Sequence, residues 1–214
     1  MASQIHLVRH AESTHNVSKD FSQLDPGLTP LGIQQAAQLG QTFPHLTHVR
    51  FIVASPLRRT IETTLIAFTK VLDKRYFDPL SENGVENGAT LILEPDLQER
   101  SNLPCDTGSS TEVLEERFPG LDFKGLPDGW QVKQGQYGSD DEAVEQRARR
   151  VRNRIGQLVE SDDLVGKEKN HIIIVTHGVF MKFLSGEPEI DLPKAGWKSY
   201  TAKHLIDGVQ LVPV

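Results

Sequence analysis

The sequence has a single cysteine, Cys105, among its 214 residues, so the chain cannot form an internal disulfide. The lack of disulfides is typical of proteins from reducing compartments. The first residues also lack a basic segment followed by a long apolar run, which predicts no signal peptide and favours a cytoplasmic location. No apolar run approaches the length of a membrane span, so we expect no membrane partner.

An excess of positive charge is also missing. The chain has 23 lysines and arginines against 29 aspartates and glutamates, a formal net charge of −6. This balance argues against a broad nucleic-acid surface, although it allows a local basic pocket for a small anion. The histidines do not fall at the paired spacings of metal ligands, so we expect no metal site and no cofactor. The histidines that we interpret as ordinary polar or core positions are His6, His15, His45, His48, His171 and His204.

Apolar strands alternate with amphipathic helices over what we expect to be one domain, residues 1–214. The pattern predicts strands at 5–8, 51–54, 90–93 and 171–175 and an edge strand within 203–212. It predicts helices at 30–43, 55–71 and 141–161 and a short one after Gly178. This alternation indicates an α/β fold with a mostly parallel sheet covered on both faces.

Between about residues 100 and 140 the periodicity is lost. Glycine, proline, serine and aspartate are frequent there. Such a composition indicates a loop-rich insertion over the core.

Polar residues follow three of the predicted strands directly. They are Arg9-His10, residues 55–59 and residues 176–178. Ligands of open α/β sheets bind beyond the carboxyl ends of the strands. We therefore expect these three segments to converge in the folded protein.

The converging residues supply the groups that phosphoryl transfer requires. Neutral imidazole is a good nucleophile near pH 7, which makes His10 a candidate, although a structural role is the alternative for a single loop histidine. Arg9 and Arg59 offer guanidinium donors that match phosphate oxygens. His177 adds to this cationic pocket, and the helix after Gly178 offers N–H groups to an anion.

The reaction also needs an acid to protonate the leaving oxygen. Glu99, just after the third predicted strand, is the natural candidate, and Asp96 is a weaker one. Cys105 is a weaker candidate nucleophile, because a cysteine phosphatase would carry an arginine where this chain has Thr111.

Together these motifs resemble the histidine phosphatase superfamily, also called the phosphoglycerate mutase-like family. Residues 7–16 read LVRHAESTHN and match the family's Arg-His-Gly signature with its later asparagine. Residues 55–59 read SPLRR and match the Ser-x-Leu-x-Arg motif, which selects Arg59 over its neighbour. The first helix, the acid segment and the late Ser/Thr-His-Gly motif of the family are matched by LTPLGIQQA at 28–36, LQER at 97–100 and THG at 176–178.

The resemblance implies a three-layer α/β/α fold, a small phosphorylated substrate and a phosphohistidine intermediate on His10. It also implies that Glu99 is the general acid. The residues that it assigns to the phosphoryl oxygens are Arg9, Asn16, Arg59 and His177.

The chain departs from the family pattern in ways that bear on the reaction. Ala11 replaces the usual glycine after the histidine, and the acid segment lacks the His-Tyr pair of glycolytic mutases. The insertion has no adjacent arginine pair, and we interpret the arginines at 147–154 as a solvated helix face. We therefore favour hydrolysis. The alternatives are mutase-like phosphotransfer and a repurposed enzyme or binding module on the same scaffold.

The sequence leaves the substrate and the oligomeric state open. We expect specificity to lie in the insertion, where the candidate contacts are Arg100, Cys105, Ser109, Ser110 and Tyr137.

Overall fold

The computed structural model describes residues 3–161 and 163–214. It contains a six-stranded sheet in the order β3-β2-β4-β1-β5-β6. The strands are β1 Ile5–Arg9, β2 Val49–Ala54, β3 Thr90–Leu93, β4 His171–Thr176, β5 Trp197–Leu205 and β6 Gly208–Pro213. The pairs among β1 to β4 are parallel, whereas β5 is antiparallel to β1 and β6 to β5. The predicted mostly parallel sheet is thus confirmed.

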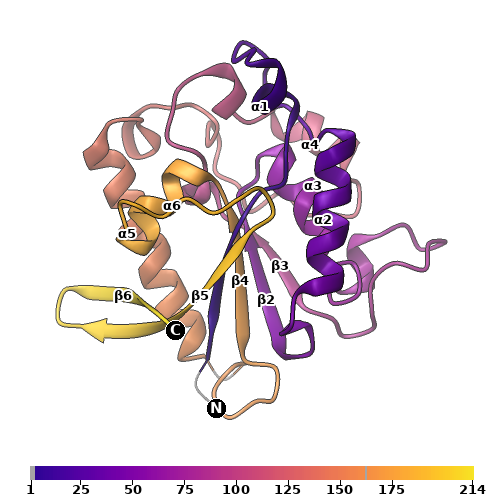
Figure 1. Ribbon diagram of the computed structural model, residues 1–214, viewed down its shortest axis with the longest axis vertical. Coiled ribbons are helices and arrows are strands. Elements are labelled where there is room, and N and C mark those ends of the chain that lie inside the picture. Colours follow the sequence, from indigo (N-terminus) through magenta and orange to yellow (C-terminus); the bar gives the residue numbers. More distant parts are fainter. Residues whose placement is uncertain (1–2, 162) are drawn as a thin grey trace.

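Helices cover both faces of this sheet. The α-helices of the described residues are α1 Thr14–Ser18, α2 Pro30–Thr42, α3 Arg58–Ala67, α4 Thr111–Arg117, α5 Asp141–Val159 and α6 Gly178–Ser185. Helices α2 and α3 lie on one side of the sheet and α5 and α6 on the other (Figure 1), which confirms the three-layer α/β/α fold. Within the described ranges, no helix combines the length and the apolar character needed to cross a bilayer.

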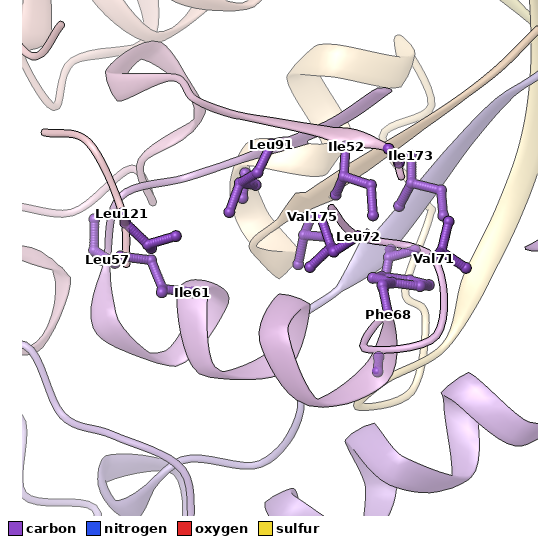
Figure 2. Packing of buried hydrophobic residues seen from close by; sticks show 14 of the residues in the cluster. Ile52, Leu57, Ile61, Phe68, Val71, Leu72, Leu91, Leu121, Ile173 and Val175 are labelled. Carbon is purple, nitrogen blue, oxygen red and sulfur yellow. The ribbon is translucent and has the colours of Figure 1, made fainter. Parts of the chain in front are cut away.

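The alternation of side chains along β4 explains why both faces need a cover. Ile173 and Val175 point into the core layer that α3 closes, whereas Ile172 and Ile174 point into the layer closed by α5 and α6. Figure 2 shows the first of these layers, which contains Ile61 of α3, Leu57 just before that helix, and strand residues such as Ile52 and Val175. Because a strand turns successive side chains to opposite faces, a continuous apolar run is buried on both sides.

Helix α3 begins later and ends earlier than the sequence predicts. The sequence predicts a helix over residues 55–71, but the helix starts at Arg58 and ends at Ala67. Leu57 is still extended, with φ −73° and ψ 142°. The residue before a proline is biased away from helical geometry, which keeps Ser55 extended and frees its hydroxyl for another partner.

The C-terminal region forms a hairpin rather than one edge strand. Residues of the predicted segment 203–212 are divided between β5 and β6, with a turn before Gly208. Gly208 has φ 142°, a backbone conformation that other residues rarely adopt. The Asp207-Gly208 pair is the turn signal that divides the predicted strand.

The insertion at 100–140 packs over the carboxyl ends of the strands. It contains α4 and short 3₁₀ turns, including Pro104–Asp106 and Gly135–Tyr137. Its buried residues Leu121 and Trp130 belong to the core layer of α3, and Figure 2 shows Leu121 beside the α3 side chains. These elements are too short for a periodic pattern to reveal them.

Candidate active site

The three polar segments converge because β4 lies between β1 and β2 in the sheet. The ladder continues past the strands: His10 N–H donates to Thr176 O at 3.0 Å, and Ser55 N–H donates to Val175 O at 3.1 Å. These bonds bring the rings of His10 and His177 to a centroid distance of 5.1 Å. A cleft of about 890 Å³ opens above them.

His10 is buried with its Nε2 atom toward Arg59. Its Nδ1 lies 2.7 Å from Ala11 O, so that nitrogen carries the proton and donates. Nε2 accepts from Arg59 Nε–H at 3.3 Å and therefore keeps its lone pair. Burial, followed by the charges of Arg59 and Lys194, lowers the pKa of His10 well below its ordinary value. A neutral imidazole with a free Nε2 is the form that attacks an electrophile.

His177 lies beside His10, directly after β4, the neighbour of β1 in the sheet. Its Nε2 lies 3.0 Å from Ser55 Oγ, which explains why Ser55 does not cap α3. Its Nδ1 is buried and has no hydrogen-bond partner in the described part of the chain. Burial and then the charge of Arg59 lower the pKa of His177. Such a nitrogen needs a polar partner, and an oxygen of a bound anion would supply it.

Arg59 is the most enclosed cation of the site, with 1% of its surface exposed. Besides its bond to His10, it donates from Nη1 to Cys105 O at 2.7 Å and from Nη2 to Asp106 Oδ1 at 2.8 Å. A guanidinium has five N–H groups, so these three bonds leave two for a ligand. The insertion thus holds Arg59 in place without exhausting its donors.

Arg9 is held by the loop before β5. Its Nη1 donates to Asp191 Oδ1 at 2.8 Å and to Leu192 O. Its Nε is buried, and the residues described offer it no acceptor. A Cβ atom on Gly178 would lie 3.0 Å from Arg9 Cζ. Gly178 therefore makes room for the Arg9 side chain.

Asn16 sits in a closed hydrogen-bond network. Its Oδ1 accepts from Ser13 N–H and Oγ–H, and its Nδ2 lies 3.0 Å from His15 Nε2. His15 Nδ1 lies 3.0 Å from Ser13 Oγ, which closes the ring of contacts. Burial and the charge of Arg59 lower the pKa of His15 to about 4, so it stays neutral. One Nδ2 hydrogen of Asn16 remains for a ligand in the cleft.

Glu99 occupies the N-terminus of α6. Its Oε1 accepts from Arg100 N–H and Phe180 N–H, and its Oε2 accepts from Val179 N–H at 3.1 Å. We expected these α6 amides to meet a bound anion, but the chain's own carboxylate takes those of Val179 and Phe180. A carboxylate is well placed there, because the N-terminus of a helix carries partial positive charge.

The segment that carries Glu99 rests on two cations, the buried Arg147 and the half-buried Lys133. Arg147 Nη1 donates to Asp96 O and Gln98 O, and Lys133 Nζ donates to Glu99 O at 2.7 Å. The interpretation of residues 147–154 as a solvated face is therefore wrong for Arg147, which is 0% exposed.

Asp96, the weaker acid candidate, is bound by Arg150. Both carboxylate oxygens of Asp96 accept from that guanidinium, at 2.7 and 2.6 Å. This two-point contact occupies the carboxylate, whereas Glu99 lines the cleft.

Among the specificity candidates of the insertion, only Arg100 and Cys105 line the cleft. Ser109 N–H donates to Asp25, Ser110 precedes α4 as its N-cap, and Tyr137 is buried in the core layer of α3. Those three expectations are wrong, because Ser109 and Ser110 lie just before α4 outside the cleft lining and Tyr137 is buried in the core.

Sequence reasoning missed the lysines and Asp106 around the site. Lys194 and Lys182 line the cleft, and Lys133 lies beneath it. No motif marks them. Arg147 could have been found, because position 147 lies three residues after Val144 on the apolar face of α5.

Cys105 lies beside His15 and Asp106. Within the ranges that the structure describes, these three form the one group of candidate metal ligands whose atoms lie within 4.8 Å of one another. Their polar atoms already bind protein groups, since Asp106 contacts Arg59 and Ser101. Burial raises the pKa of the Cys105 thiol to about 11, so the thiolate that a nucleophile or ligand requires is scarce near neutral pH.

Comparison with known proteins gives the same family as the motifs. The model of the histidine phosphatase superfamily (branch 1) matches residues 5–202. A Schizosaccharomyces pombe protein named as a probable phosphatase is 28% identical over 200 residues, covering 89% of this chain and 83% of that protein. An Arabidopsis thaliana phosphoglycerate mutase-like protein is 32% identical over 143 residues, covering 56% of this chain and 53% of its own.

Solved structures share the fold. A mycobacterial glucosyl-3-phosphoglycerate phosphatase in complex with VO3 matches with a TM-score of 0.60 at 18% identity, covering 99% of this chain and 97% of that chain. A mutant phosphoserine phosphatase of Entamoeba histolytica with phosphoserine matches with a TM-score of 0.54 at 20% identity, covering 98% and 94%. At these identities the likeness concerns the arrangement of helices and strands.

Proposed function

Because this chain belongs to the histidine phosphatase superfamily, we propose that it hydrolyses the phosphate monoester of a small metabolite through a phosphohistidine on His10. The observation that carries the proposal is the state of His10 Nε2. This atom is unprotonated, faces the guanidinium of Arg59 and belongs to a residue that lines the cleft.

The first step transfers the phosphoryl group to the enzyme. The Nε2 lone pair forms a bond to phosphorus while the bond to the leaving oxygen breaks. The freed alkoxide takes a proton from the Glu99 carboxyl group. Arg59, Arg9, Asn16 and the unpartnered Nδ1 of His177 supply donors for the other phosphoryl oxygens. Fixed donors around a transferring phosphoryl group lower the barrier without reorganising during the reaction.

The second step returns the enzyme to its starting state. Water attacks phosphorus, the bond from phosphorus to Nε2 breaks, and Glu99 takes a proton from the attacking water. Inorganic phosphate is released and the Glu99 carboxyl group is protonated again, so atoms and charges balance over the cycle. The reaction uses Glu99 first as an acid and then as a base.

The leaving group has room in the same cleft. Its outer wall combines polar residues of the insertion, such as Ser101 and Asn102, with the apolar side chains of Phe21 and Leu103. We therefore propose a small phosphorylated substrate whose alcohol part contacts the insertion, which lines a cleft far larger than a phosphate ion alone.

The experiment that tests this function traps the intermediate. The enzyme is mixed with a ³²P-labelled aryl phosphate and quenched in alkaline detergent, where phosphohistidine is stable. We expect label on the wild-type protein that is lost in acid, and none on His10→Ala. Acid-stable label, or equal labelling of His10→Ala, would contradict the proposal.

The fate of the phosphoryl group separates hydrolysis from phosphotransfer. We expect inorganic phosphate as the product even when an acceptor alcohol or a phosphoglycerate is added in excess. Transfer to the acceptor would favour the mutase-like alternative. Absence of both labelling and turnover over a broad panel of monoesters would favour a repurposed enzyme or binding module.

A further inference from the structure

The loop before β5 places a lysine in the cleft beside the phosphate-site candidates. Lys194 lines the same cleft as His10, Arg9 and Arg59 and is half-buried. In the part of the chain that the structure describes, no residue accepts a hydrogen bond from its ammonium or forms an ion pair with it. Arg9 and Arg59, in contrast, each donate to a carboxylate of the protein.

The backbone around Lys194 is tied to the residues of the site. Arg9 N–H donates to Gly196 O at 3.0 Å, and Ala195 N–H donates to His10 O at 3.4 Å. Ala195 has φ 58°, in the left-handed region that residues other than glycine rarely adopt. A strained residue held by contacts on both sides fixes the direction of its neighbour, and strain of this kind concentrates at functional sites.

Electrostatics places the Lys194 charge close to the reacting atoms. Burial and the charges of Arg9 and Arg59 lower the pKa of Lys194 to about 8. In return, Lys194 lowers the pKa of His10 more than Arg9 does, and it also lowers that of His177. Three cations that share a partly buried site repel one another, and a bound dianion removes that repulsion.

We propose that Lys194 is a third phosphoryl-binding cation, whose Nζ contacts an oxygen of the phosphoryl group as it moves to and from His10. The inference rests on the proposed function and adds a residue that the family motifs of this sequence do not include. The ligand chemistry is that of a phosphate dianion, either free or as the terminal group of a monoester.

Binding of inorganic phosphate tests the inference without any need for turnover. Calorimetry measures the Kd of phosphate for the wild type, Lys194→Met, Lys194→Arg and Lys182→Met. Lys182 is the matched control, because it is also a half-buried lysine of this cleft but is not among the main charges that lower the pKa of His10 or His177. Thermal unfolding of each variant verifies that the fold is kept.

We expect Lys194→Met to weaken phosphate binding about 10–100-fold, the effect of one charge-assisted hydrogen bond. The kcat/KM for an aryl phosphate should fall by a similar factor. Lys194→Arg should recover most of both, and Lys182→Met should change each less than about threefold.

Unchanged phosphate binding in Lys194→Met would overturn the inference, and a loss confined to kcat/KM would place Lys194 against the leaving group instead. A wild-type protein that binds phosphate through Lys194 but hydrolyses no monoester would contradict the proposed function only.

Discussion

Strands β1 and β4, at the centre of the sheet, have one pair of histidines near their amino ends and a second pair just beyond their carboxyl ends. The spacing of the rings is the same in both pairs, but their hydrogen bonds and surroundings differ. His6 in β1 and His171 at the start of β4 have ring centroids 5.1 Å apart, as do His10 and His177 beyond the carboxyl ends. The first pair is closed: His6 Nε2 lies 3.1 Å from His171 Nδ1, and His6 Nδ1 lies 2.8 Å from Ser199 Oγ. In the second pair His10 lines the cleft, and the buried His177 Nδ1 has no partner among the described residues.

The surroundings of the pairs explain their different uses. Burial lowers the pKa at both ends, but the next contributions at the amino end come from other histidines, including His45. At the carboxyl end they come first from Arg59, followed by Lys194 for His10 and by His10 itself for His177. Neutral imidazoles among aromatic rings are suited to a core, whereas neutral imidazoles among several cations are suited to binding an anion. Position in a parallel sheet thus separates the pair that we propose for chemistry from the pair that packs in the core.

The largest expected difference between the ends is in turnover. We expect His10→Ala to lower kcat by at least about 10³-fold while leaving the unfolding temperature nearly unchanged, because positioning alone cannot replace a nucleophile. His171→Gln is the matched change at the other end and should keep kcat within about twofold. Steady-state kinetics on one aryl phosphate measures both variants. Activity of His10→Ala within about tenfold of wild type, a barrier change near 1.4 kcal/mol, would refute the assignment.

A second prediction sharpens the chemistry of the carboxyl end. We expect Glu99→Gln to slow hydrolysis of alkyl phosphates by about 10²–10⁴-fold and that of nitrophenyl phosphate much less, because only the alkoxide needs a proton as it leaves. The glutamine amide oxygen can still accept the two bonds from Arg100 N–H and Phe180 N–H, whereas the bond from Val179 N–H is lost, so thermal unfolding of the variant must verify that the fold is kept. Comparison of kcat/KM for the two substrates measures the effect. An equal loss for both leaving groups would move the acid role to another carboxyl group.

Much of the carboxyl end could be predicted because it depends on local signals. The apolar run of β4 ends where the polar motif 176–178 begins, and the parallel order of the strands brings such ends together. Lys194 could not be predicted, because only the contacts of its loop with Arg9 and His10 turn it into the cleft.

One error and one feature that the sequence does not reveal also have tertiary causes. The sequence predicts that the N–H groups at the start of α6 are available to an anion. In the structure they donate to Glu99, which precedes Gly178, the first residue of α6, by 79 residues. The pairing of His6 with His171 depends on strand register, in which His6 lies opposite Ile173, and register is set by burial across the whole sheet.

The smallest expected effect is a pH-dependent change in the free energy of unfolding, caused by His6 and His171 at the amino ends of the strands. The pKa is about 3 for His6 and about 4 for His171 in the folded protein, against about 6.5 for imidazole in an unfolded chain. Between these values the unfolded chain binds protons that the folded chain does not. The free energy of unfolding should therefore be independent of these groups above pH 6.5 and should fall as the pH drops from 6.5 toward 4.

Denaturant unfolding at pH 7.5 and pH 5.0 measures this loss, to which each buried histidine contributes up to about 2 kcal/mol. His10, His15 and His177 also contribute, because their pKa values are lowered too.

The test is therefore a difference between variants. We expect His6→Phe to be less stable at pH 7.5, since Ser199 and His171 lose a partner, yet to lose less stability on acidification. Exposed His204, replaced by glutamine, should keep the wild-type loss. If His6→Phe loses as much stability as the wild type between the two pH values, the closed pair is not the acid-sensitive part of the fold, and the sensitivity belongs to the carboxyl end instead.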